Sequence, residues 1–144
     1  DTTDGEIYQV NVTVSKAPGA GDINLLNVTA QWTGPSGSYD ILNDAVASGS
    51  NGGFTTDEFK DASNSYQRGV SEVLTSSDDR FIMTFTLDDA GAEATNDDTS
   101  DLDRINSIGE NEEVLIELTT QSGGVTEVRF QTPASLRSES SVSL

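Results

Sequence analysis

Apolar and polar residues alternate with a period of two in several short segments of this chain. In the first of them, Tyr8, Val10, Val12 and Val14 are separated by polar residues. The same alternation recurs in residues 27–33 and 80–87, and residues 112–120 and 125–132 are two further strand-like segments. Because successive side chains of a strand point to opposite faces, each segment is predicted to be a strand with one buried face.

Turn-forming residues separate these segments. Residues 17–21 (APGAG) and 34–37 (GPSG) each contain a Pro and a Gly, and residues 121–124 (QSGG) end in Gly-Gly. The last of these predicts a hairpin between the strands that flank it. Residues 45–53 are rich in Ser, Gly and Asn, and residues 88–103 are acidic, so both are predicted to be loops.

Two further segments do not show the period of two clearly. Residues 55–58 (TTDE) match a capping box, which predicts a single helical turn anchored by Phe59. The C-terminal tail is polar with sparse apolar residues and is expected to end in a short edge strand. Short strands, frequent turns and almost no helix predict one all-β domain, a β-sandwich spanning residues 1–144.

Charge narrows the function classes. The chain carries 25 Asp and Glu against 7 Lys and Arg, a formal net charge of −18. Such a surface repels nucleic-acid phosphates and anionic membranes, so we expect neither as a partner. The acids are spread among well-formed apolar segments, and only two lysines are present, Lys16 and Lys60. This composition on a folded pattern indicates a halophile's protein, because molar salt screens the self-repulsion; an ordinary acidic extracellular domain is the alternative.

The sequence offers little for catalysis. It has no Cys and no His, which excludes disulfides, thiolate zinc sites and His-based acid–base chemistry. Adjacent carboxylates on a strand point to opposite faces and do not form a facing pair. Trp32 falls on the inward side of its segment, which favours core packing over sugar stacking. We therefore expect a protein that is not an enzyme.

One candidate metal site stands out. Residues 60–65 (KDASNS) provide oxygen-bearing side chains at Asp61, Ser63, Asn64 and Ser65, which suit a hard cation such as Ca²⁺ or Mg²⁺. Asp78 and Asp79 would complete the site if the fold returned them nearby. The acidic segment 88–103 lacks the glycine and the terminal glutamate of an EF-hand loop, so a solvated acidic surface is the better interpretation there.

Two N-x-[ST] sequons, at Asn11 and Asn27, are candidate N-glycosylation sites. Both asparagines are predicted to lie on the polar, outward side of their strands, where a glycan would not disturb the core.

Three blocks of the chain resemble the archaellins, the subunits of the archaeal swimming filament. Residues 12–38 show the pattern K-x-A-P-G-x-x-x-I-x-L at Lys16, Ala17, Pro18, Gly19, Ile23 and Leu25, followed by a Gly-Pro turn. Residues 78–87 (DDRFIMTFTL) are similar to the family's D-R-F strand, and residues 119–136 to its C-terminal hairpin. The resemblance also implies a divalent-cation loop with a D-x-D-x-S pattern, matched at Asp61 and Ser65 but with Ser63 in place of the second Asp.

This resemblance implies the outer, immunoglobulin-like antiparallel β-sandwich of a halophilic archaellin, without the long hydrophobic N-terminal helix of that family. The expected function is structural, at an extracellular site in the archaellum filament. The expected partners are copies of the chain itself or other archaellins of the same filament. The alternative from another class is an immunoglobulin-like domain of a halophile adhesive or surface-layer protein that depends on Ca²⁺.

Overall fold

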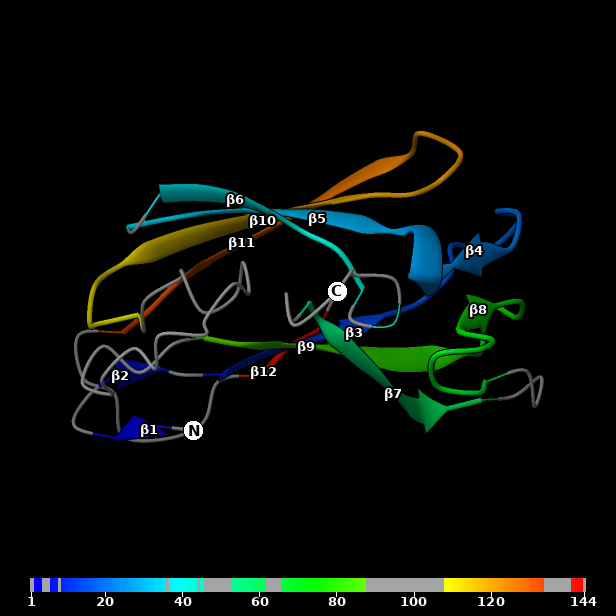
Figure 1. Cartoon of the computed structure of the whole chain (residues 1–144), viewed down its shortest axis with the longest axis horizontal. Helices are drawn as coiled ribbons and strands as arrows, with labels where there is room; N and C mark the ends of the chain where they lie inside the picture. Colours follow the sequence, from blue (N-terminus) through cyan, green and yellow to red (C-terminus); the bar gives the residue numbers. More distant parts are fainter. Residues whose placement is uncertain are drawn as a thin grey trace.

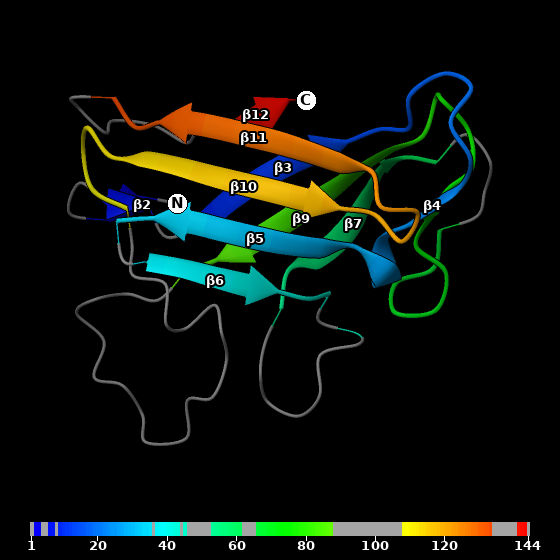
Figure 2. The same cartoon turned by 90° about the horizontal axis from the view of Figure 1, so that it is seen from above.

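Two four-stranded sheets make up most of the computed structural model, which describes residues 2–3, 6–7, 9–35, 37–43, 45, 53–61, 66–87, 108–133 and 141–143. The strand order is β11-β10-β5-β6 in one sheet and β12-β3-β9-β7 in the other. Figure 1 shows the sheets as two layers, and Figure 2 shows the strands of the second crossing beneath those of the first. The predicted immunoglobulin-like β-sandwich is confirmed.

The strands fall largely where the period of two predicts them. The first sheet contains β5 (Thr29–Gly34), β6 (Gly37–Ile41), β10 (Glu113–Thr119) and β11 (Val125–Gln131). The second contains β3 (Gln9–Val14), β7 (Thr55–Lys60), β9 (Arg80–Thr86) and β12 (Ser141–Ser143). Short pairs at the two ends are β1 (Thr2–Thr3) with β2 (Glu6–Ile7), and β4 (Ile23–Asn24) with β8 (Val73–Leu74), next to the 3-10 helix η1 (Leu25–Asn27).

The core lies between the two sheets. In the second sheet Val12 of β3 is paired with Met83 of β9, and both side chains are fully buried. In the first sheet Trp32 of β5 is paired with Ile116 of β10, and both are again fully buried. The alternation therefore puts one apolar row of each strand into the sandwich, and the hydrophobic burial of these rows stabilises it.

Aromatic rings join the two sheets across this core. The ring centroids of Trp32 and Phe85 are 6.0 Å apart, and those of Phe85 and Phe54 are 5.7 Å apart. Phe130 approaches Trp32 edge-on, with its centroid at 6.5 Å. The inward position predicted for Trp32 is confirmed, since this side chain has no exposed surface.

One predicted element is wrong. Residues 55–58 form part of strand β7 and not a helical turn. Thr56 is buried in register with Met83 of β9, so pairing with β9 outweighs the local capping signal. Phe59 does not anchor a helix; it lies at a register shift between Glu58 and Lys60, and 71% of it is exposed.

Two other predictions need adjustment. Asn27 does not lie on a strand, because it ends η1, and strand β5 begins two residues later. The C-terminal edge strand is confirmed as β12, but β12 runs parallel to β3, so this sheet is not antiparallel throughout.

Several predictions lie outside the described residues. These are the acidic loop 88–103, most of the loop 45–53, and the inward position of Tyr8. Among the residues that the structure does describe, no helix has the length and apolar character needed to cross a membrane.

Candidate functional site

The fold brings part of the predicted metal site to one place. Lys60 of β7 is in register with Arg80 of β9, so Asp61 follows β7 at the same end of the sheet where Asp79 precedes β9. The pairing of β7 with β9 therefore brings these two aspartates close together, although they are far apart in the sequence. Ser63, Asn64 and Ser65 lie outside the described residues.

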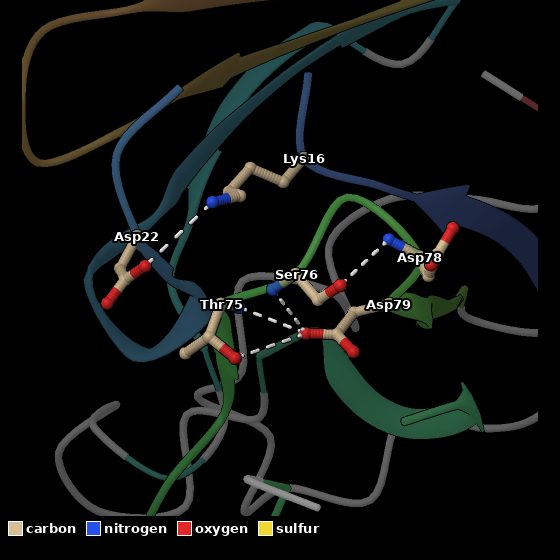
Figure 3. A network of polar contacts seen from close by, with 6 residues as sticks. All are labelled: Lys16, Asp22, Thr75, Ser76, Asp78 and Asp79. Atoms are coloured by element: carbon tan, nitrogen blue, oxygen red, sulfur yellow. Dashed lines mark hydrogen bonds and ion pairs between the residues drawn. The ribbon is translucent and has the colours of Figure 1, made fainter. Parts of the chain in front are cut away.

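Asp79 is committed to a turn. Its side chain is fully buried, and Oδ2 accepts hydrogen bonds from the backbone N–H of Thr75 at 3.0 Å and of Ser76 at 2.9 Å. The Thr75 hydroxyl donates to the same oxygen at 3.4 Å. Figure 3 shows how these donors surround the Asp79 carboxylate. These hydrogen bonds stabilise the β8–β9 turn. Because Oδ2 already accepts them, it is less available as a ligand for a cation.

Asp78 behaves differently. It is exposed, and the contact described for it is through its backbone N–H, which donates to Ser76 Oγ at 3.2 Å. Its carboxylate is therefore placed at the surface. The neighbouring ion pair in Figure 3 joins Lys16 Nζ to Asp22 Oδ1 at 3.9 Å, between the end of β3 and the start of β4.

Asp61 is tied to Tyr66. The carboxylate Oδ2 of Asp61 accepts the Tyr66 backbone N–H at 2.8 Å, and the Tyr66 hydroxyl donates to the Thr56 carbonyl at 2.6 Å. The Tyr66 ring packs edge-on against Phe81, with centroids 5.0 Å apart. Burial raises the pKa of Tyr66 above its ordinary value, and the nearby negative charge of Glu72 adds to the rise.

These hydrogen bonds limit how the aspartates at the end of β7 could bind a metal ion. Asp61 and Asp79 are close in register, but each has one carboxylate oxygen engaged by backbone donors. Within the described ranges no group of three or more Asp, Glu, His or Cys is arranged to hold a metal ion. A cation there would need oxygen ligands from residues 62–65 in addition to these aspartates.

The two sequons differ in accessibility. Asn27 is exposed at the end of η1, and its amide Nδ2 donates to Gln121 Oε1 at 3.0 Å. Asn11 is half-buried on β3, on the outward side predicted for it, between Thr84 of β9 and Ser141 of β12. Asn27 is the more accessible acceptor.

A row of acidic residues that the sequence patterns did not single out crosses the outward side of the first sheet. Glu127, Glu117, Gln31 and Asp40 occupy successive strands β11, β10, β5 and β6 at one level of the register. Glu117 and Glu127 are direct cross-strand partners, an arrangement that destabilises a sheet by like-charge repulsion. We call the outward side of this sheet, with Glu113 and Arg129, the acidic face.

An apolar cavity of about 210 Å³ opens at the end of the sandwich that carries β4 and β8, and its lining includes Ile23 and Leu74. Its walls include Val14, Leu25, Met83 and Leu118, and its polar side chains are those of Ser15, Thr120 and Thr126. Hydroxyl groups in an apolar wall offer no charged group for acid–base chemistry.

The sequence was compared with those of known proteins. No family model matches the chain. Flagellin B2 and Flagellin B1 of Halobacterium salinarum are 32% and 29% identical to it over 96% of its length, and Flagellin A2 of Haloferax volcanii is 27% identical over 91%. Its relatives are halophilic archaeal flagellins. The resemblance to the archaellins is thus confirmed.

The similarity covers only part of the flagellins in sequence, and it extends to the fold. The chain spans 60–62% of the length of these flagellins. The crystal structure of archaeal flagellin FlaB1 from Methanocaldococcus jannaschii superposes with a TM-score of 0.67, at 14% identity, over 93% of this chain and 83% of that one. At that identity the superposition shows a shared fold.

Proposed function

We propose that this β-sandwich is the outer globular domain of a subunit of an archaeal swimming filament in a halophile, with residues 1–144 forming one domain. The observation that carries the proposal is similarity to flagellins over nearly the whole chain, together with a shared fold. In this role the domain performs no chemistry and is not an enzyme. It forms an extracellular shell, and its partners are copies of itself or other flagellins of the same filament.

The acidic face supports the halophilic part of this proposal. Glu117 opposite Glu127 is unfavourable in dilute solution, and molar salt, in which the Debye length is about 3 Å or less, removes the repulsion. A surface of this kind suits a protein that works in brine and remains soluble there through hydration of its carboxylates.

Immunoelectron microscopy tests the function. An antibody raised against the 144-residue domain is expected to label swimming filaments along their length, and labelling is expected to vanish in a strain from which the gene is deleted. Label confined to the cell envelope, with filaments unlabelled, would contradict the proposal and favour the adhesive or surface-layer alternative.

We also propose a divalent cation, Ca²⁺ or Mg²⁺, at the end of β7, with ligands from Asp61, Ser63, Asn64, Ser65, Asp78 and Asp79. The register that brings Asp61 beside Asp79 supports it, as does the hard oxygen character of the set. A cation at about 100 times its dissociation constant would stabilise the fold by about 2.7 kcal/mol.

Thermal unfolding at constant ionic strength tests this site. The midpoint should rise with Ca²⁺ and fall back with chelator, and Asp61→Asn should abolish the response. Asp22→Asn is the matched control, because Asp22 lies at the same end but is paired with Lys16. An unchanged midpoint in the wild-type chain would refute the site.

We propose N-glycosylation of at least one of the two sequon asparagines, Asn11 and Asn27. Peptide mapping of native material by mass spectrometry tests each acceptor separately, and unmodified peptides at both positions would refute modification.

A further inference from the structure

The two outer faces of the sandwich differ in charge. We call the outward side of the second sheet the neutral face; its central strands β3 and β9 present Gln9, Asn11, Thr13, Ile82, Thr84 and Thr86. Its edge strand β7 adds exposed Asp57, in register with Ile82, and exposed Lys60, in register with Arg80, so charges of both signs lie at this edge. On those two strands the charged residue is Arg80, at the end of β9. Its guanidinium Nη1 donates to the backbone carbonyls of Ser77 at 2.6 Å and Asp79 at 2.8 Å, so it is directed into the adjacent turn.

The acidic face has the opposite character. Its outward carboxylates are Glu113, Glu117, Glu127 and Asp40, and the cation among them is Arg129. Arg129 Nε lies 3.5 Å from Glu113 Oε1. Among the described residues, the row formed by Glu127, Glu117 and Asp40 makes no ion pair with a Lys or Arg.

This asymmetry matters for association between copies. Molar salt screens the long-range repulsion between two copies that each carry a formal net charge of −18, but it does not remove the cost of desolvating a carboxylate. Burying an unpaired carboxylate in an interface adds a desolvation penalty, whereas neutral Thr, Asn, Gln and Ile side chains add none of this kind. The side of the sandwich that a second copy can cover at least electrostatic penalty is the neutral face.

We propose that the neutral face is the surface on which a second copy of the chain packs, while the acidic face remains toward solvent. The proposal rests on the filament function proposed above and identifies which side of the domain makes the contact.

The composition of the neutral face fits an interface. Ile82 lies on it in register with Thr13 on one side and Asp57 of β7 on the other. On the same edge strand Phe59 is 71% exposed, an aromatic side chain of the type that anchors protein–protein contacts. Thr and Asn side chains around these apolar groups supply donors and acceptors for the roughly ten hydrogen bonds of a typical interface.

One consequence concerns the sequons. Asn11 lies within the neutral face, whereas Asn27 lies at the end of η1, next to Gln121. A bulky glycan on Asn11 would hold a second copy away from β3 and β9. The proposal therefore assigns glycan attachment in assembled filaments to Asn27 and leaves Asn11 unmodified.

Cysteine accessibility tests the proposal directly, because the chain has no native Cys. Thr84→Cys places a thiol on the neutral face, on β9, and Thr33→Cys places the matched thiol on the acidic face, on β5. Each variant is expressed from its own gene in the halophile, and maleimide labelling rates are compared between intact filaments and dissociated subunits. The ratio of the two rates removes differences in intrinsic exposure.

The Thr84→Cys thiol should label about ten-fold or more slowly in filaments than in dissociated subunits, since the core of an interface is packed like a protein interior. The Thr33→Cys thiol should label at the same rate in both states. Equal rates for Thr84→Cys would overturn the proposal, as would a glycan found on Asn11 in filaments. Thr13→Cys on β3 is a second neutral-face position with the same expectation.

The outcomes also separate this proposal from the filament function. The Thr84→Cys variant could fold with the wild-type unfolding midpoint and yet fail to assemble, while Thr33→Cys assembles. That result would support the neutral face as the contact surface. If the antibody described above fails to label filaments at all, the filament function fails, and that result is independent of either cysteine.

Discussion

The cross-strand pair of Glu117 and Glu127 gives a quantitative test of how this protein depends on salt. The two residues are direct partners in the β10–β11 hairpin, and Glu117 faces uncharged Gln31 on its other side. We expect Glu117→Gln to stabilise the fold at low salt by removing this repulsion.

The magnitude follows from the geometry. Cross-strand partners have Cβ atoms about 5 Å apart, and two charges about 6 Å apart in water repel by about 0.7 kcal/mol. At an ionic strength of about 0.15 M the Debye length is about 8 Å, so about half of this energy remains, and in about 3 M salt almost none does. The variant should therefore be more stable than wild type by about 0.3–0.7 kcal/mol at low salt and equal to it in brine.

Urea unfolding followed by the fluorescence of Trp32 is the assay. Trp32 is the single tryptophan and is fully buried, and urea leaves the ionic strength unchanged. Glu113→Gln is the matched control, because Glu113 lies on the same face of β10 but is paired with Arg129. Its neutralisation removes an attraction and should leave low-salt stability unchanged or slightly lower.

Two results would refute the reasoning. If Glu117→Gln and Glu113→Gln change the low-salt free energy of unfolding in the same direction, the register of like charges is not the cause. If the gain from Glu117→Gln persists undiminished in about 3 M salt, the effect is not electrostatic, since screening at that ionic strength is nearly complete.

Three further predictions concern the core and the turns. Gly34→Ala would place a Cβ 2.9 Å from Nε1 of the immobile Trp32 ring, so the free energy of unfolding should fall by about 1–3 kcal/mol. Asp79→Ala leaves the half-buried backbone N–H groups of Thr75 and Ser76 without their acceptor and should lower the free energy of unfolding by about 1–3 kcal/mol. Because burial raises the pKa of Tyr66, the neutral phenol contributes stability that is fully present below about pH 10 and lost as the pH rises through its raised pKa, so Tyr66→Phe should flatten the alkaline loss of stability in urea titrations.

Matched variants accompany these measurements. Gly21→Ala adds a Cβ with no atom within 4 Å and should leave the unfolding midpoint unchanged, which separates steric conflict from a general effect of replacing glycine. Asp78→Ala, one residue from Asp79 but exposed, should change the free energy of unfolding by less than about 0.5 kcal/mol. An alkaline profile of Tyr66→Phe identical to that of wild type would show that another group controls stability at high pH.

The sequence by itself determined most of the long strands and the side of each that is buried. A period of two is a local property, because adjacent side chains of a strand point to opposite faces whatever the strand pairs with. This is why the inward positions of Val12, Trp32 and Met83 could be predicted before any pairing was known. The net charge and the lack of Cys and His were equally readable from composition.

Only the tertiary structure decided which residues face each other. The capping-box residues 55–58 became part of β7 because β9 offers a partner strand, and no local pattern contains that information. The pairing of Glu117 with Glu127, and the approach of Asp61 to Asp79, depend on register between strands. The same register separates an acidic face from a neutral one. The net charge of −18 gives the excess of carboxylates, but strand pairing decides on which face they lie.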